Sequence, residues 1–139
     1  MNIESILQPL FVMALLNVVM LVWMMATRIP AMHKAGIETE NATKDTMQTL
    51  PQSVTQIADN YNHLFEQPTL FYAVVLAIAA LGHVDAVHVG CAWSFAGLRV
   101  AHSLVQATVN IIAIRFSFFI LSWLALAVMI VRESARIFL

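Results

Sequence analysis

The sequence predicts an all-α integral membrane protein built as a bundle of four transmembrane helices. Hydrophobic residues make up 60% of the 139 residues and charged residues only 11%, which is too apolar for an ordinary soluble domain. Four long apolar stretches follow one another along the chain. Each should form a helix, because lipid offers the backbone no hydrogen-bond partner. We therefore expect residues 1–139 to form a single domain in a lipid bilayer.

The first predicted span covers about residues 7–26. No charged residue occurs between Glu4 and Arg28, so this stretch exceeds the about 20 residues with which a helix crosses a bilayer. A cleaved signal peptide is the alternative. The stretch has no basic beginning and no small-residue cleavage site near Thr27, and it is long for such a peptide. We expect a retained transmembrane helix.

A long exposed loop is predicted next, over about residues 28–53. This part of the chain is rich in Thr, Lys, Glu, Asp and Asn, and it contains three residues that interrupt regular structure: Pro30, Gly36 and Pro51.

The remaining predicted spans cover about residues 64–82, 86–106 and 115–133. Helix-compatible sequence precedes the second of them from about residue 54, and Pro68 should bend that helix. The connection between the second and third spans is short, so these two helices are expected to be antiparallel neighbours.

The distribution of basic residues predicts the orientation of the bundle. The long loop carries Arg28, Lys34 and Lys44, and Arg115 lies on the same side. Only two basic residues, both near the C-terminus, lie on the other side. The positive-inside rule therefore places the 28–53 loop in the cytoplasm and both termini outside. The net charge of −1 and the lack of a basic run argue against a nucleic-acid partner.

Two polar stripes mark the candidate functional site. At the spacing i, i+3, i+4, i+7 a helix places residues on one face. One stripe precedes and enters the second span, and the other lies within the third. The first consists of Asp59, Asn62, His63 and Glu66, and the second of Arg99, His102, Gln106 and Asn110. Charged groups at membrane depth are costly and are usually paired and functional. The two stripes could face one another, or they could face the same groove at a subunit boundary.

Other interpretations of these polar residues remain open. A Glu66–Arg99 pair could act only as a clamp between two helices. A metal site of His63, Glu66 and His102 lacks any recognised local motif. An ion pathway through Asp59, Glu66 and His102 is also conceivable, although four spans without repeat symmetry offer little machinery for transport.

The residues around the short turn and next to His102 receive simpler interpretations. His83, Asp85 and His88 are expected to be solvated turn residues. Ser103 directly follows His102, but adjacency in sequence does not orient a nucleophile against a base. A hydrolase is therefore discounted.

Three segments of the chain resemble the MAPEG superfamily, the membrane-associated proteins in eicosanoid and glutathione metabolism. The first is the run Asn62-His-Leu-Phe-Glu66-Gln-Pro68-Thr-Leu-Phe-Tyr72, and the second runs from Ala92 to Ser103 with Arg99 and His102. The third, Asn-x4-Arg-Phe from Asn110 to Phe116, is similar to an uncharacterised bacterial branch. The resemblance covers nearly the whole chain and implies a bacterial inner membrane as its location.

The resemblance implies a left-handed four-helix bundle that assembles as a homotrimer. Enzymes of this superfamily bind glutathione as cosubstrate in clefts between subunits, near the mouth that carries the long loop. Asn62 and Glu66 match residues that hold the polar groups of the tripeptide, and Arg99 matches an arginine of the third helix. The arginines expected near the thiolate are Arg28 and Arg115. The candidate cofactor-binding set is Asn62, His63, Glu66, Arg99, His102 and Gln106.

The resemblance therefore implies a glutathione-dependent transferase or peroxidase that acts on lipophilic electrophiles. The chain departs from the family pattern in three respects. Three residues instead of two separate Asn62 from Glu66, Ala58 replaces an arginine, and Gln67 stands where a tyrosine often follows. These departures favour the alternative, a non-catalytic protein of the same fold that binds a lipid, a quinone or a partner protein in the intersubunit cleft.

Overall fold

The computed structural model describes residues 1–139, and every regular element is a helix. Three helical segments are long and apolar enough to cross a membrane: α1, the segment Gln52–Ala80 and α6. Polar residues exclude α5 from this set, so the fourth span remains a prediction. The elements are α1 (Ile3–Ala35), η1 (Thr39–Asn41), α2 (Lys44–Met47), α3 (Gln52–His63), α4 (Gln67–Ala80), α5 (Ala86–Ala107) and α6 (Ile112–Phe138).

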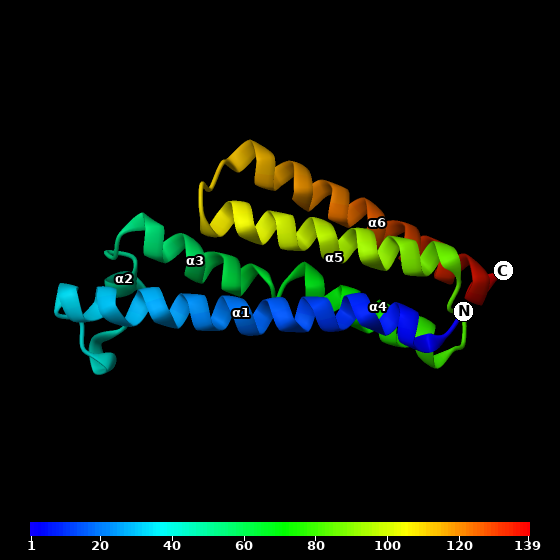
Figure 1. The fold of residues 1–139 in the computed structure, drawn as a ribbon, viewed down its shortest axis with the longest axis horizontal. Coiled ribbons are helices and arrows are strands. Elements are labelled where there is room, and N and C mark those ends of the chain that lie inside the picture. Colours follow the sequence, from blue (N-terminus) through cyan, green and yellow to red (C-terminus); the bar gives the residue numbers. More distant parts are fainter.

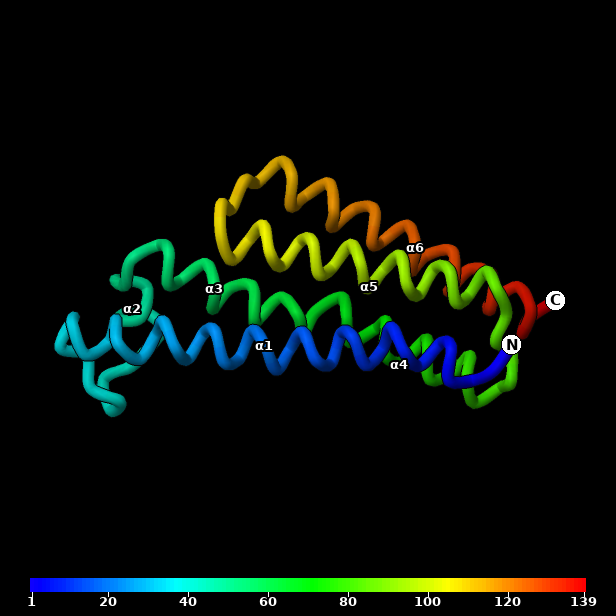
Figure 2. The backbone as a smooth tube through the Cα atoms, in the orientation of Figure 1, coloured from blue at the N-terminus to red at the C-terminus, as the bar shows by residue number.

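The long helices lie roughly side by side (Figure 1). Helix α5 packs most extensively against α6, while α1 contacts α3, α4 and α5, and α4 contacts α6. Both chain termini lie at one end of the bundle, and α2 lies at the other (Figure 2). The core contains methionine, aliphatic and aromatic side chains from every long helix, including Met13, Met20, Phe71, Phe95 and Leu126.

Helix α1 is longer than the sequence predicts. It continues through Pro30 to Ala35, so the first eight residues of the predicted 28–53 loop are helical. Prolines are tolerated inside membrane helices, and Pro30 does not end this one. The helix ends at Gly36, which adopts a left-handed conformation with φ of 68°. The Ile37 N–H then bonds to the Met32 carbonyl at 3.0 Å, as in a Schellman motif.

The rest of the predicted loop is also more ordered than a simple exposed connection. It contains η1 and α2, and α3 already begins at Gln52. Met47 and Leu50 are buried. The loop therefore folds back on the bundle through these two apolar side chains, which the sequence pattern did not single out.

The second span is interrupted rather than bent. Helix α3 ends at His63 and α4 begins at Gln67, with the connection Leu64–Glu66 between them. Pro68 has no N–H to donate, and its ring would clash with the Leu64 carbonyl in a continuous helix. In the first turn of a new helix a proline is well accommodated. The interruption places non-helical backbone beside the polar residues, as is tolerated where backbone lines a cavity.

The interruption also changes which helices are neighbours. The short turn predicts that the second and third spans pack as antiparallel neighbours along their length. In the structure α3 packs on α5, whereas α4 packs mainly on α1 and α6. One contact between α4 and α5 is aromatic: the buried rings of Phe71 and Phe95 stack with centroids 4.2 Å apart.

Candidate functional site

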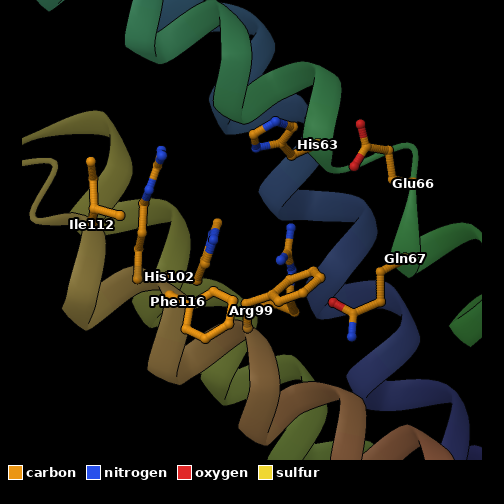
Figure 3. Close-up of a pocket in the computed structure, with 9 residues that line it drawn as sticks. His63, Glu66, Gln67, Arg99, His102, Ile112 and Phe116 are labelled. Carbon is orange, nitrogen blue, oxygen red and sulfur yellow. The ribbon is translucent and has the colours of Figure 1, made fainter.

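A polar cleft opens where the α3–α4 interruption faces α5 and the beginning of α6. Its cavity volume is about 250 Å³. Figure 3 shows His63, Glu66 and Gln67 beside the interruption, with Arg99, His102, Ile112 and Phe116 across from them. Its complete lining is His63, Glu66, Gln67, Arg99, His102, Ile112, Arg115, Phe116 and Phe119. Five of the predicted site residues therefore meet here: His63, Glu66, Arg99, His102 and Arg115.

Arg99 is the most unusual residue of this cleft. Its side chain is only 1% exposed, and neither Nε nor Nη2 has a hydrogen-bond partner. Glu66 lines the same cleft but is exposed and forms no ion pair with Arg99. The inter-helix clamp considered for these two residues is therefore not formed within this chain. An arginine buried without a partner is costly, and anions are the ligands that satisfy it best.

The neighbours of Arg99 on α5 are buried polar side chains. Gln106 is hydrogen-bonded through its amide to His63 Nδ1, at 3.2–3.3 Å, which joins α5 to α3. His102 is buried, and its Nδ1 has no partner. The His63–Gln106 pair is thus one point at which the two stripes contact each other. His102 retains a free polar atom at the cleft.

The beginning of α6 supplies the opposite wall of the cleft. Arg115 is half-buried, and Ile112, Phe116 and Phe119 add an apolar surface around it. The sequence analysis included Arg115 but not these three apolar residues. Their spacing of three and four residues along α6 gives them one face. In an almost wholly apolar helix, that signal does not distinguish a cleft-lining face from a lipid-facing one.

Two predicted site residues lie in a different cleft. Arg28 and Asn62 line a second cleft with a cavity volume of about 210 Å³, together with Lys44 and Asp59. The first polar stripe is therefore divided, because Asp59 and Asn62 face this second cleft while His63 and Glu66 face the first. The division falls within α3, because Asn62 and His63 are adjacent on that helix and point about 100° apart, and only Glu66 lies beyond its end. Within one subunit the structure does not bring Arg28 and Asn62 together with Arg99 and Arg115.

Gln67 lines the first cleft and also connects two helices. Its side-chain amide is bonded to Ser122 of α6 at 3.2 Å, and both residues are buried. The departure from the family pattern at this position thus has a structural role in the α4–α6 contact.

The first cleft is positively charged and has an apolar side. Two arginines and two histidines face one carboxylate, so its net charge is positive even when both histidines are neutral. No group of three or more His, Cys, Asp or Glu side chains is arranged to hold a metal ion. A ligand with both carboxylate and ammonium groups would complement Arg99 and Glu66 together.

Comparison with known proteins identifies a family for nearly the whole chain. The family model described as the MAPEG family matches residues 6–133. No curated protein and no solved structure matches the chain. The matched range includes every residue of the first cleft and the second.

Proposed function

The chain belongs to the MAPEG family and is an integral membrane protein of the glutathione and eicosanoid metabolism superfamily, and from this premise we propose that it is a glutathione-dependent transferase or peroxidase. The observation that carries the proposal is Arg99, a buried guanidinium with two unpartnered nitrogens at a cleft. A carboxylate of glutathione would satisfy these donors. Glu66 would receive the ammonium group of the same tripeptide.

The chemical step requires a thiolate beside a cation. A thiol with a pKa of about 8.5 is mostly protonated at neutral pH, and the thiolate is the nucleophile. A nearby arginine stabilises the anion and lowers this pKa. Arg115 and Arg28 are the candidates for this role. In conjugation the thiolate sulfur would form a bond to an electrophilic carbon, and the bond from that carbon to its leaving group would break. In peroxide reduction the sulfur would form a bond to one peroxide oxygen, the O–O bond would break and the other oxygen would leave as an alcohol. A second glutathione would then displace water from the resulting sulfenic acid and form the disulfide.

The second substrate is proposed to be lipophilic. Ile112, Phe116 and Phe119 form the apolar side of the cleft next to Arg115. A lipophilic electrophile would reach this side from the bilayer and meet the thiolate there. The same apolar surface would be unfavourable for a charged cosubstrate. The charged cosubstrate would therefore occupy the polar part of the cleft, and the lipophilic substrate the apolar part.

A homotrimer would explain the division of the predicted residues between two clefts. In the superfamily, glutathione lies between subunits. We propose that the second cleft of one subunit, with Arg28 and Asn62, adjoins the first cleft of its neighbour, with Arg99 and Arg115. In a bacterial inner membrane the 28–53 loop would face the cytoplasm, where glutathione is available.

The test is isothermal titration of glutathione into the detergent-purified oligomer. We expect saturable binding in the wild-type protein and loss of binding in Glu66→Ala and Arg99→Ala variants that still fold and assemble. Glu4→Ala is a matched control, since Glu4 lies in the first turn of α1, remote from both clefts. Absence of binding at millimolar glutathione, confirmed by a second assay, would refute the proposal.

A second candidate function is supported by the departures at Ala58 and Gln67. Gln67 is committed to Ser122 and is not free to contact a ligand through the bonded atom. A non-catalytic protein of this fold would instead bind a lipid, a quinone or a partner protein in the cleft. Mass spectrometry of the purified oligomer would then recover a bound lipid or quinone whose retention is unaffected by glutathione.

A further inference from the structure

A second polar cluster lies at the other end of the bundle, where the α4–α5 turn meets the last turns of α6. The sequence analysis expected His83, Asp85 and His88 to be solvated. The structure corrects this for His88, which is 0% exposed, and it adds Glu133 of α6, which is 6% exposed. Ionisable side chains are almost never so deeply buried unless they are paired. The cluster is separate from both clefts.

Two links join the turn to α6 in this cluster. His83 Nδ1 is hydrogen-bonded to the Glu133 carboxylate. Arg132 Nη2 donates to Asp85 Oδ2 at 2.6 Å. Asp85 also caps α5, because its Oδ1 accepts a hydrogen bond from the His88 backbone N–H at 2.9 Å. Residues almost fifty positions apart in the sequence thus hold the turn against α6.

The contacts of the two His88 ring nitrogens show which nitrogen would take up an added proton. Nδ1 lies 3.0 Å from the His83 carbonyl oxygen, which can only accept, so Nδ1 carries the hydrogen. In a neutral ring Nε2 is then an acceptor. Nε2 lies 3.8 Å from Glu133 Oε2, and both atoms are buried without another partner. Two facing acceptors repel, whereas a proton on Nε2 turns the contact into an ion pair.

The net charge of the cluster also favours an added proton between His88 and Glu133. Asp85 and Glu133 supply two negative charges, and Arg132 supplies one positive charge. The Asp85–Arg132 pair balances its own charge at a partly exposed position, so with both histidines neutral the buried part of the cluster carries the single negative charge of Glu133. One added proton makes the cluster neutral. Burying a net charge is costly, so the protonated form is the one that this geometry accommodates.

We propose that one proton, held on His88 Nε2, fastens the α4–α5 turn to α6 and that this clasp loosens when the proton leaves as the pH rises. The clasp consists of His83, Asp85, His88, Arg132 and Glu133. Histidine is the side chain whose charge ordinarily changes between about pH 5 and pH 8. The clasp is closed while this proton is bound and is loosened once it has left.

Other titratable groups at this end do not take part. Neither a hydrogen bond nor an ion pair joins any of them to His88 or Glu133. They are Cys91 on α5, Arg136 on α6, and Glu4 with the chain's amino terminus at the start of α1. The response to pH is accordingly assigned to the five clasp residues.

Amide hydrogen exchange of the full-length oligomer tests the clasp. Protection factors, corrected for intrinsic exchange at each pH, are measured at pH 6 and pH 8 for the turn amides of Gly82, His83 and His88, which all donate hydrogen bonds. We expect protection to fall with rising pH by up to about tenfold per pH unit, the limit for one proton. Amides in the middle of α1 serve as the internal reference and should not change.

Three variants distinguish an effect of the proton on His88 from a general loss of folding. In Glu133→Gln the amide donates to a neutral His88 and its oxygen accepts from His83, so protection should become equal at both pH values. In His88→Gln no proton can be held, and protection should be low at both. His33→Gln, at the other end of α1, should retain the wild-type response. Equal protection at both pH values in the wild-type protein would overturn the proposal. So would a fall that persists in both Glu133→Gln and His88→Gln.

Discussion

At the residue scale, Arg99 combines complete burial with incomplete hydrogen bonding. The Nε and Nη2 atoms have no partner inside the subunit. A buried charged group without partners lowers stability, and it is kept mainly where the group has a function. An apolar residue of similar size would pack at the same position without this loss of stability. The effects of Arg99 on stability and on glutathione binding can both be measured in one variant.

We expect Arg99→Met to unfold at an equal or higher temperature than the wild-type protein while losing glutathione binding. Replacing buried charged groups with apolar residues of similar volume is often neutral or stabilising by about 1–4 kcal/mol. Thermal unfolding and titration of the same preparation measure both effects. Arg132→Met removes an arginine that is bonded to Asp85 far from the cleft, so it should still bind glutathione. A destabilised Arg99→Met that binds normally would contradict the assignment.

Asp85 is the residue whose ionisation is most clearly tied to local structure. The hydrogen bond from the His88 backbone N–H is the main cause that lowers its pKa below the ordinary value of 3.8, and Arg132 adds to this. A lowered pKa means that the folded state favours the carboxylate. The stabilisation is therefore present at neutral pH and is lost as the pH falls through the lowered pKa.

We expect Asp85→Ala to reduce the free energy of unfolding at pH 7 by about 0.5–2 kcal/mol, as loss of a helix N-cap does. Asp85→Asn should retain most of this stability, since asparagine caps equally well and a partly exposed ion pair with Arg132 adds little. Denaturant unfolding in mild detergent measures the differences. The deficit of Asp85→Ala should shrink in acid, and a deficit that grows there would contradict the mechanism.

At the element scale, the interruption between α3 and α4 organises the cleft. It sets Glu66 outside either helix, where Glu66 lines the first cleft together with His63 of α3. Pro68 explains why the chain cannot continue as one helix there. The sequence predicted a bend at this place, and the structure has a complete break of three residues.

We expect Pro68→Ala to extend helical structure across Leu64–Glu66 and to weaken glutathione binding by about tenfold or more. A displacement of about 1 Å is sufficient to impair a site whose groups are held in place by the scaffold. Hydrogen exchange of the amides at the break and titration of glutathione are the two measurements. Pro30→Ala, in the exposed last turns of α1, is the matched control and should bind normally. Unchanged binding with a continuous helix would show that the break is not needed.

At the scale of the whole molecule, the proposed site requires two subunits. One subunit contains two clefts, and the predicted residues are divided between them. Much of the outer surface is apolar, with Phe11, Leu15 and Val22 of α1 more than half exposed. Such a surface must be covered by lipid or by neighbouring subunits.

Mixed oligomers test whether the two clefts are joined between subunits. Arg28→Ala and Arg99→Met should each abolish glutathione binding when every subunit carries the change. Coexpressed in equal amounts, the two variants should restore about a quarter of the sites, as random assembly of a composite interface gives. Titration of the mixed oligomer counts the sites. No recovery would mean that both arginines act within one subunit, and normal binding by Arg28→Ala alone would exclude a role for the second cleft.

Much of the fold could be predicted because it depends on local properties of the chain. Long apolar stretches must become helices in lipid, and the family match over residues 6–133 confirms the resemblance found in the sequence motifs. Three members of the stripe on α5 were predictable, because Arg99, His102 and Gln106 lie on one continuous helix and keep their periodicity, whereas Asn110 lies beyond its end. The first stripe failed as a unit, because Asn62 and His63 of α3 line different clefts and Glu66 lies beyond the helix.

The sequence by itself determined an all-helical membrane protein of the MAPEG family, with its polar residues concentrated on two segments. Only the tertiary structure decided that Arg28 and Asn62 lie apart from Arg99, and that Glu133 meets His83 and His88. The physical reason is that periodicity fixes directions within one helix. The partners of a side chain depend on where helices break and which faces then pack together, and those choices are settled by contacts between residues distant in the chain.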